Sequence, residues 1–291
     1  MRVGMPATLE ESAAYHSLSS TPPDDADTLA PVTITQVQVA LSGAIPALVA
    51  MWLVDRLDRK RPEPARTRRL AALFGMLSVI PAIGAELGLG YTLGKHVGSQ
   101  LTYEGATVNA FLVAAAVEEA CKFFVIYWFL WRRPEVDERL DGIVYASRAG
   151  LGFALVENVM YLLWQPSLSG QLTTWILRAF LAVPGHALWS GMIGALAARR
   201  RFDGKGLGLL WGYLLAVAFH GLYDLAIFVQ QPMMLEGNDS GRWLLLVPIA
   251  LTFLAFFVVR SMARTALHLD DSDAATRAAA HAVRMQEPAK L

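Results

Sequence analysis

The chain has 291 residues, of which 55% are hydrophobic and only 17% are charged, and its mean hydropathy is +0.40. Soluble domains carry about 25% charged residues, so this composition excludes an ordinary soluble domain and indicates a membrane protein. The net charge of zero gives no information about partners until the charges are placed along the chain. The only cysteine, Cys121, excludes an intramolecular disulfide.

The first segment, residues 1–35, is rich in Ser, Thr, Pro and Asp and contains five acids against one arginine. It has no apolar stretch preceded by positive charge, so a cleavable signal peptide is not expected. We expect 1–35 to be a disordered extracytoplasmic tail.

Seven apolar stretches follow, each close to the roughly 20 residues that a membrane-spanning helix needs. We therefore expect an all-α, polytopic membrane protein whose transmembrane domain covers 36–262. Residues 263–291 are expected to form a cytoplasmic polar tail, in which Asp273 would cap a short helix over 274–286. The seven stretches lie near 36–54, 70–91, 107–131, 143–164, 172–198, 206–230 and 243–262.

Positive charges in the connections predict the orientation. If the N-terminus lies outside, the inner loops and the C-terminal tail hold nineteen lysines and arginines and the outer segments hold three. Such a bias is typical of cytoplasmic loops, so we expect seven spans with the N-terminus outside and the C-terminus in the cytoplasm. The basic cluster at 56–69 is explained by this rule, and no nucleic-acid partner is expected.

Ionisable residues inside a span cost about 2.5–3.5 kcal/mol each by the lower scales, and they usually mark functional sites. In the third predicted span, Lys122 follows Glu118 by four residues and Glu119 by three, so its ammonium can reach either carboxylate. One glutamate could be held ionised while the other acts as a general base, and the residues alone do not decide which. The alternative is an internal ion pair that only joins helices.

The fourth and fifth spans each add a candidate. Glu157 lies one turn after Phe153 and could act chemically or only form an interhelical hydrogen bond. His186 follows Pro184, which removes a backbone hydrogen bond and bends the helix beside the imidazole. A lone buried histidine is more often structural than a ligand. Arg178 lies near a span end, and its charge is expected to extend to the membrane surface.

In the sixth span, His220 and Asp224 are four residues apart and share one helix face. The carboxylate could orient the imidazole, or both groups could bind a metal. Counted at about 1.5 Å per residue, Glu118, Glu157, His186 and His220 all fall roughly 10–20 Å below the outer surface. This shared depth predicts one active site buried within the membrane.

The motifs, in this order, resemble the PrsW family of bacterial intramembrane proteases, which is similar in turn to the CAAX prenyl endopeptidases and Abi proteins. The family pattern E-E-x-x-K, F-x-x-x-E, a histidine and H-x-x-x-D is matched over roughly residues 107–230. The resemblance implies a peptidase that cleaves a membrane-anchored protein near the outer face. In the best-known family role, that substrate is an anti-sigma factor in a stress-signalling cascade. The catalytic residues that it implies are Glu118, Glu119, Lys122, Glu157, His186, His220 and Asp224.

The resemblance also implies a metal, because the family is usually classed among metalloproteases. The chain has no H-E-x-x-H sequence. A divalent ion, with zinc as the first candidate, could instead be held by His186, His220 and Glu157 from separate helices, with water as a fourth ligand. Without a metal, a glutamate would activate water directly while imidazoles stabilise the oxyanion. Both mechanisms remain open at this point.

Other functions also remain open. A proton- or ion-coupled transporter places Glu, His, Asp and Lys at the membrane midplane, although such folds usually show paired halves and this sequence has no convincing repeat. A non-catalytic scaffold would use the polar groups for assembly alone. A prenyl-protein endopeptidase would act on the inner side, and the outward position of Glu157 and Asp224 disfavours it.

Overall fold

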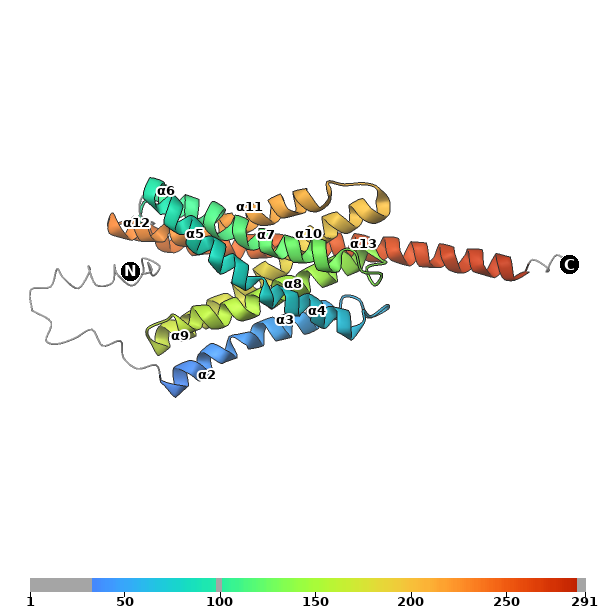
Figure 1. Ribbon diagram of the computed structural model, residues 1–291, viewed down its shortest axis with the longest axis horizontal. Coiled ribbons are helices and arrows are strands. Elements are labelled where there is room, and N and C mark those ends of the chain that lie inside the picture. The colour runs from blue at the N-terminus through green and yellow to red at the C-terminus, as the bar shows by residue number, and fades with distance from the viewer. Residues whose placement is uncertain (1–32, 98–100, 287–291) are drawn as a thin grey trace, which may run out of the picture.

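A computed structural model describes residues 33–97 and 101–286, and this part of the chain is all-α. Most helices run along the long axis of one bundle, and the last helix extends well beyond it (Figure 1). The predicted disordered tail at 1–35 lies almost entirely outside the described residues and stays a prediction. The predicted all-α fold is confirmed.

Seven helical stretches build the bundle, and several are divided by a tight turn or a π-helical segment. The π-helical segments are η1 (Asn109–Ala115), η2 (Ile126–Leu130) and η3 (Arg178–Ala182), and η4 (Asp239–Leu245) is a 3₁₀ helix. The α-helices are α2 (Ile34–Ser42), α3 (Ala44–Asp55), α4 (Ala65–Leu77), α5 (Val79–Val97), α6 (Tyr103–Val108), α7 (Ala116–Val125), α8 (Arg139–Leu163), α9 (Leu168–Leu177), α10 (Val183–Asp203), α11 (Gly208–Phe228), α12 (Gln230–Leu235) and α13 (Leu246–Gln286).

Five helical stretches among the described residues are long and apolar enough to cross a membrane. The two other predicted spans are also helical: residues 103–130 form α6, η1, α7 and η2, and α8 covers the fourth span. These two stretches contain the charged residues of the third and fourth spans, which lower their apolar character. Helices therefore occupy all seven predicted spans, and their orientation in a membrane stays a prediction. The five apolar stretches are Ile34–Asp55, Ala65–Gly94, Leu168–Asp203, Gly208–Leu235 and Asp239–His281.

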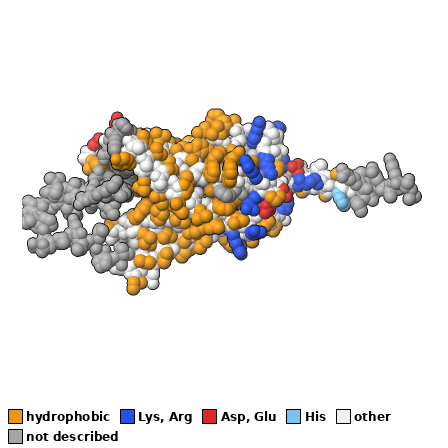
Figure 2. Space-filling view, viewed as in Figure 1, with side chains coloured by type: hydrophobic (Ala, Val, Ile, Leu, Met, Phe, Trp, Pro, Cys, Tyr) orange, Lys and Arg blue, Asp and Glu red, His pale blue; other side chains and the backbone are white. Residues whose placement is uncertain are grey.

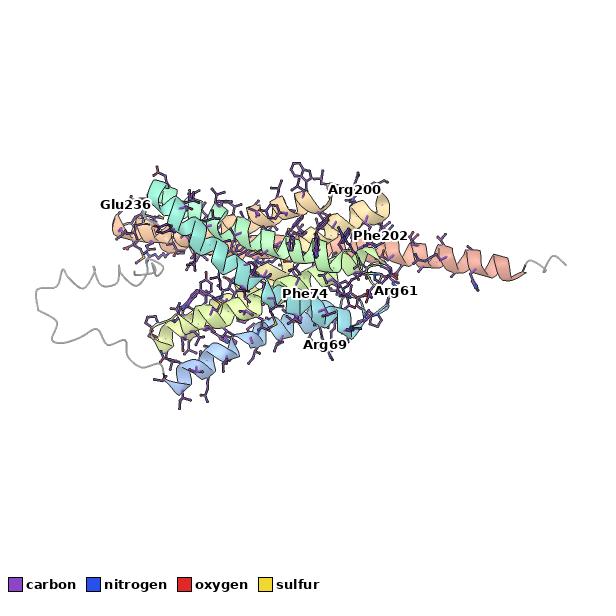
Figure 3. All side chains as sticks on the ribbon, viewed as in Figure 1. Arg61, Arg69, Phe74, Arg200, Phe202 and Glu236 are labelled. Carbon is purple, nitrogen blue, oxygen red and sulfur yellow. The ribbon has the colours of Figure 1, made fainter. Side chains whose placement is uncertain are left out.

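The surface divides into an apolar middle and one strongly basic end. Figure 2 shows hydrophobic side chains along most of the bundle and a band of lysine and arginine where α13 leaves it. We call this the basic end; Arg61, Arg69 and Arg200 lie there, and Glu236 lies at the opposite end (Figure 3). An apolar middle is what a bilayer core requires.

Ion pairs join three helices at the basic end. Arg139 at the start of α8 binds Asp203 of α10 at 2.6 Å and two aspartates of α13, Asp270 at 2.9 Å and Asp273 at 2.8 Å. Helix α13 passes Asp273 without a break. The prediction of a separate short helix capped by Asp273 is therefore wrong, because that carboxylate pairs with an arginine of another helix.

Helix α8 is the centre of the bundle, and small residues let its neighbours approach closely. A Cβ atom added to Gly194 of α10 would lie 1.9 Å from the backbone oxygen of Gly142 in α8. On another face of α8, a Cβ on Gly152 would lie 2.0 Å from the backbone oxygen of Ala72 in α4. Backbone therefore packs directly against backbone on two faces of α8.

This packing predicts that Gly194→Ala destabilises the protein by about 1–3 kcal/mol, because the added methyl group must push α10 away from α8. Thermal unfolding of the purified protein in detergent measures the change. Gly84→Ala is the matched control, since an added Cβ there meets no atom within 4 Å. Equal unfolding midpoints for the two variants would contradict the close packing.

Candidate active site

The structure brings all seven predicted site residues into one connected group inside the bundle. Six of them are buried, and the carboxyl group of Asp224 is partly buried. Four neighbouring helices contribute. Helix α7 carries Glu118, Glu119 and Lys122, α8 carries Glu157, α10 carries His186, and α11 carries His220 and Asp224.

Lys122 lies at the middle of this group, with none of its side chain exposed. Its Nζ donates hydrogen bonds to Glu118 Oε2 at 3.1 Å and to Glu119 Oε1 at 2.8 Å. It also lies 2.8 Å from His186 Nδ1 and 4.1 Å from the centre of the Phe153 ring. The predicted reach of Lys122 to both glutamates of its own helix is therefore present, and the ammonium also contacts α10 and α8.

His220 lies between the carboxylates of Glu119 and Asp224. Its Nδ1 lies 2.9 Å from Glu119 Oε1, and its Nε2 lies 3.3 Å from Asp224 Oδ2. The ring stacks on Trp189, with 4.3 Å between centroids and 17° between the planes. Both ring nitrogens therefore face carboxylates, which holds the orientation of the imidazole on both sides.

The second oxygen of Glu119 has a different environment. Glu119 is completely buried, yet its Oε2 has no hydrogen-bond partner among the described residues, while Oε1 contacts Lys122 and His220. Buried acceptors without a partner are rare and need an explanation. One oxygen is thus held in place by two nitrogens, and the other has no hydrogen-bond partner among the described residues.

Glu118, Glu157 and His186 form a group that could hold a metal ion. Each residue offers one ligand atom, and these atoms lie within 4.8 Å of one another. His186 Nε2 is 2.7 Å from Glu157 Oε2, but the contact lacks hydrogen-bond geometry. Two carboxylates and an imidazole are donors that catalytic zinc sites use, so the residues fit a divalent ion. His220 lies outside this group, and its role as a metal ligand stays a prediction.

Arg178 belongs to the site, although its sequence position suggested a charge directed to the membrane surface. Its Nη2 lies 2.7 Å from Glu157 Oε2, and its Nε donates to Asn158 Oδ1 at 2.7 Å. The guanidinium also lies 4.0 Å from the centre of the Tyr161 ring. Arg178 and His186 are eight residues apart, which is about 80° around a regular α-helix, so their spacing in the sequence gives no clear signal that they meet.

π-helical turns precede both the α7 and the α10 parts of the site. Segment η1 ends just before α7, and η3 (Arg178–Ala182) ends just before Pro184. Such turns insert an extra residue and are frequent at functional sites. The irregularity predicted beside His186 is therefore present, as a π-helical turn that accommodates the proline.

Close contact of α8 and α10 also brings the imidazole of His186 toward the helix that carries the carboxylate of Glu157. A Cβ added to Gly150 would lie 2.3 Å from the backbone oxygen of His186. The absence of a side chain at Gly150 thus lets the backbone carrying His186 approach α8, which carries Glu157. Phe153 of α8 packs beside the same imidazole, with 5.6 Å between ring centroids.

Comparison with known proteins shows the family to which the chain belongs. The sequence profile of the PrsW family intramembrane metalloproteases matches residues 63–261. The chain is 33% identical to Protease PrsW of Geobacillus kaustophilus over 192 residues, which cover 65% of this chain and 80% of that protein. It is 28% identical to Protease PrsW of Bacillus subtilis over 195 residues, or 66% and 82% of the two chains. It is also 28% identical to Protease PrsW of Clostridioides difficile over 200 residues, or 67% and 81%.

No solved structure matches the chain. The family match covers more than half of the sequence and includes all four helices of the site. The chain therefore belongs to the PrsW family of intramembrane metalloproteases, and it is a multi-pass membrane peptidase.

Proposed function

We propose that this peptidase hydrolyses a peptide bond of a membrane-anchored protein at the group formed by α7, α8, α10 and α11. The observation that carries the proposal is a continuous path of contacts from Glu118 through Lys122 and His186 to Glu157. Ionisable groups at this depth are costly unless they pair, bind or react. An anti-sigma factor of a stress-signalling cascade is the first substrate to test.

The proposed protease domain covers 36–262, crosses the bilayer seven times and has its N-terminus outside and its C-terminal tail, 263–291, in the cytoplasm. The band of positive charge at the basic end supports this orientation (Figure 2). Glu157 lies eighteen residues beyond the first residue of α8, or about 27 Å along the helix from the basic end. The reaction would therefore take place toward the extracytoplasmic side.

We assign the general base to Glu119. Its Oε1 is fixed by Lys122 and His220, and its Oε2 is the buried acceptor without a partner. A base of this kind must reach the proton of the attacking water directly. His220, held by Asp224, keeps the carboxylate in place, and Lys122 offsets part of the negative charge of the two neighbouring glutamates.

The proposed metal ligands are Glu118, Glu157 and His186, with zinc as the first ion to test. The sequence prediction had His220 as the third ligand. We propose Glu118 in its place because the Glu118 carboxylate lies close to the ligand atoms of Glu157 and His186. When bound, the ion would polarise the scissile carbonyl and lower the pKa of water. Arg178 positions Glu157 through the contact to its Oε2.

The assignment of the base predicts that Glu119→Gln lowers the cleavage rate by about 10²–10⁴-fold, since the amide cannot accept the proton of water. Cleavage of a single-span reporter protein in liposomes measures the rate. Glu104→Gln is the control because this glutamate is exposed and lies outside the site. A Glu119→Gln enzyme with the wild-type rate would contradict the assignment.

The metal assignment predicts that purified protein binds one zinc ion and that His186→Ala and Glu157→Gln lower the bound zinc at least tenfold. Elemental analysis after gel filtration gives this readout independently of activity. Removal of zinc by a chelator should stop cleavage, and added zinc should restore it in the wild type only. Cleavage that resists the chelator would exclude the metal and leave the glutamate mechanism.

A further inference from the structure

Three carboxylates meet at the basic end, at a site separate from the candidate active site. Asp58 follows α3, Glu63 precedes α4, and Asp141 lies in the first turn of α8. One oxygen of each residue lies within 4.8 Å of an oxygen of the other two. Segments that are far apart in the sequence thus direct three acids at one point.

Two of these carboxylates are buried without full hydrogen bonding. Asp58 is only 2% exposed, and neither of its oxygens forms a hydrogen bond of normal geometry with any described residue, although the Arg61 backbone lies near. Asp141 is completely buried, and its Oδ2 accepts from the backbone N–H groups of Asp137 and Glu138 at 2.9 and 2.6 Å. Its Oδ1 has no hydrogen-bond partner in residues 33–97 and 101–286. Unsatisfied acceptors of this kind point to a missing ligand.

The neighbouring basic side chains do not supply that ligand. Arg61 binds Glu138 through Nε and Asp271 through Nη1, the latter at 2.9 Å. Its Nη2 is buried and forms no hydrogen bond with the three acids. Lys60 is also engaged with Asp271, at 2.7 Å. The three carboxylates therefore lack direct ion pairs within the described part of the chain.

An ion can reach the cluster from solution. A cleft of about 530 Å³ opens at the basic end, and Glu63 lines it together with Arg61, Pro64, Glu135 and Glu138. Glu63 itself is only partly buried, and its Oε2 accepts a hydrogen bond from Tyr145. Glu63 thus connects the cleft to the two buried aspartates.

We propose that Asp58, Glu63 and Asp141 bind one hard divalent cation, Ca²⁺ or Mg²⁺. The donors are all carboxylate oxygens, and such sets prefer hard cations to zinc. Two oxygens bound to one Ca²⁺ at 2.3–2.6 Å are at most about 5 Å apart, so oxygens that lie within 4.8 Å of one another can share one ion. The bound ion links the connection between α3 and α4 to the start of α8, the helix that carries Glu157.

The test uses the purified full-length protein in detergent, stripped with EDTA and dialysed. Binding of radioactive Ca²⁺ is measured by equilibrium dialysis with and without Mg²⁺ as competitor, and thermal unfolding is followed in parallel. We expect one bound ion per protein. At a free Ca²⁺ concentration ten times its dissociation constant, the midpoint of thermal unfolding should rise by about 3–5 °C. Asp58→Asn should lose both effects, and without cations its midpoint should equal or exceed that of the wild type, because one repelling charge is gone.

Two further variants separate this site from the active site and from general damage. Asp239→Asn, at an exposed aspartate, and Glu157→Gln, in the candidate active site, should both keep the cation response. If Asp58→Asn does not fold, Glu63→Gln takes its place and should lose the response. Absence of bound cation in the wild type would overturn the proposal in favour of acids that share a proton. Loss of the response in Glu157→Gln, or its retention in Asp58→Asn and Glu63→Gln, would also overturn it.

Discussion

The ammonium of Lys122 in the apolar interior is the constraint on which the site depends. An unpaired charge there would be strongly destabilising, and loss of one partner of a buried pair costs about 3–5 kcal/mol. The partners of Lys122 are two carboxylates of its own helix and His186 of α10. Helices α7 and α10 are therefore held together by a charged contact as well as by packing, so the site contributes to the stability of the fold.

Charge also explains why a cation suits this site. Four carboxylates, those of Glu118, Glu119, Glu157 and Asp224, face only two permanently basic groups, Lys122 and Arg178, among the described residues of the site. Protons or a divalent ion can supply the remaining positive charge. Glu157 Oε2 lies 2.7 Å from Arg178 Nη2 and 2.7 Å from His186 Nε2, but neither contact has hydrogen-bond geometry. The hydrogen-bonding capacity of this oxygen is therefore incompletely satisfied by the described residues.

Much of this arrangement could be predicted from sequence, because hydropathy reveals apolar helices and rare intramembrane charges stand out against them. Arg178 was predicted to direct its charge to the membrane surface because it lies near a span end. The sequence did not reveal the π-helical turn that begins at Arg178, whose guanidinium contacts Glu157. Asp273 resembled a helix cap in its local sequence. Its actual ion pair with Arg139 joins residues that are far apart in the sequence, so the local pattern could not reveal it. The carboxylates at 58, 63 and 141 resembled ordinary loop and helix-end acids. Their meeting depends on tertiary packing alone.

The donor chemistry of the two carboxylate groups would keep their ions apart. His186 adds a nitrogen to the group in the bundle interior, and imidazole favours zinc. Asp58, Glu63 and Asp141 offer oxygen only, which favours Ca²⁺ or Mg²⁺. Helix α8 carries one acid of each group, Asp141 in its first turn and Glu157 near its far end. A cation at the start of α8 would thus fix the helix on which Glu157 depends, without competing for the metal that Glu157 is proposed to bind.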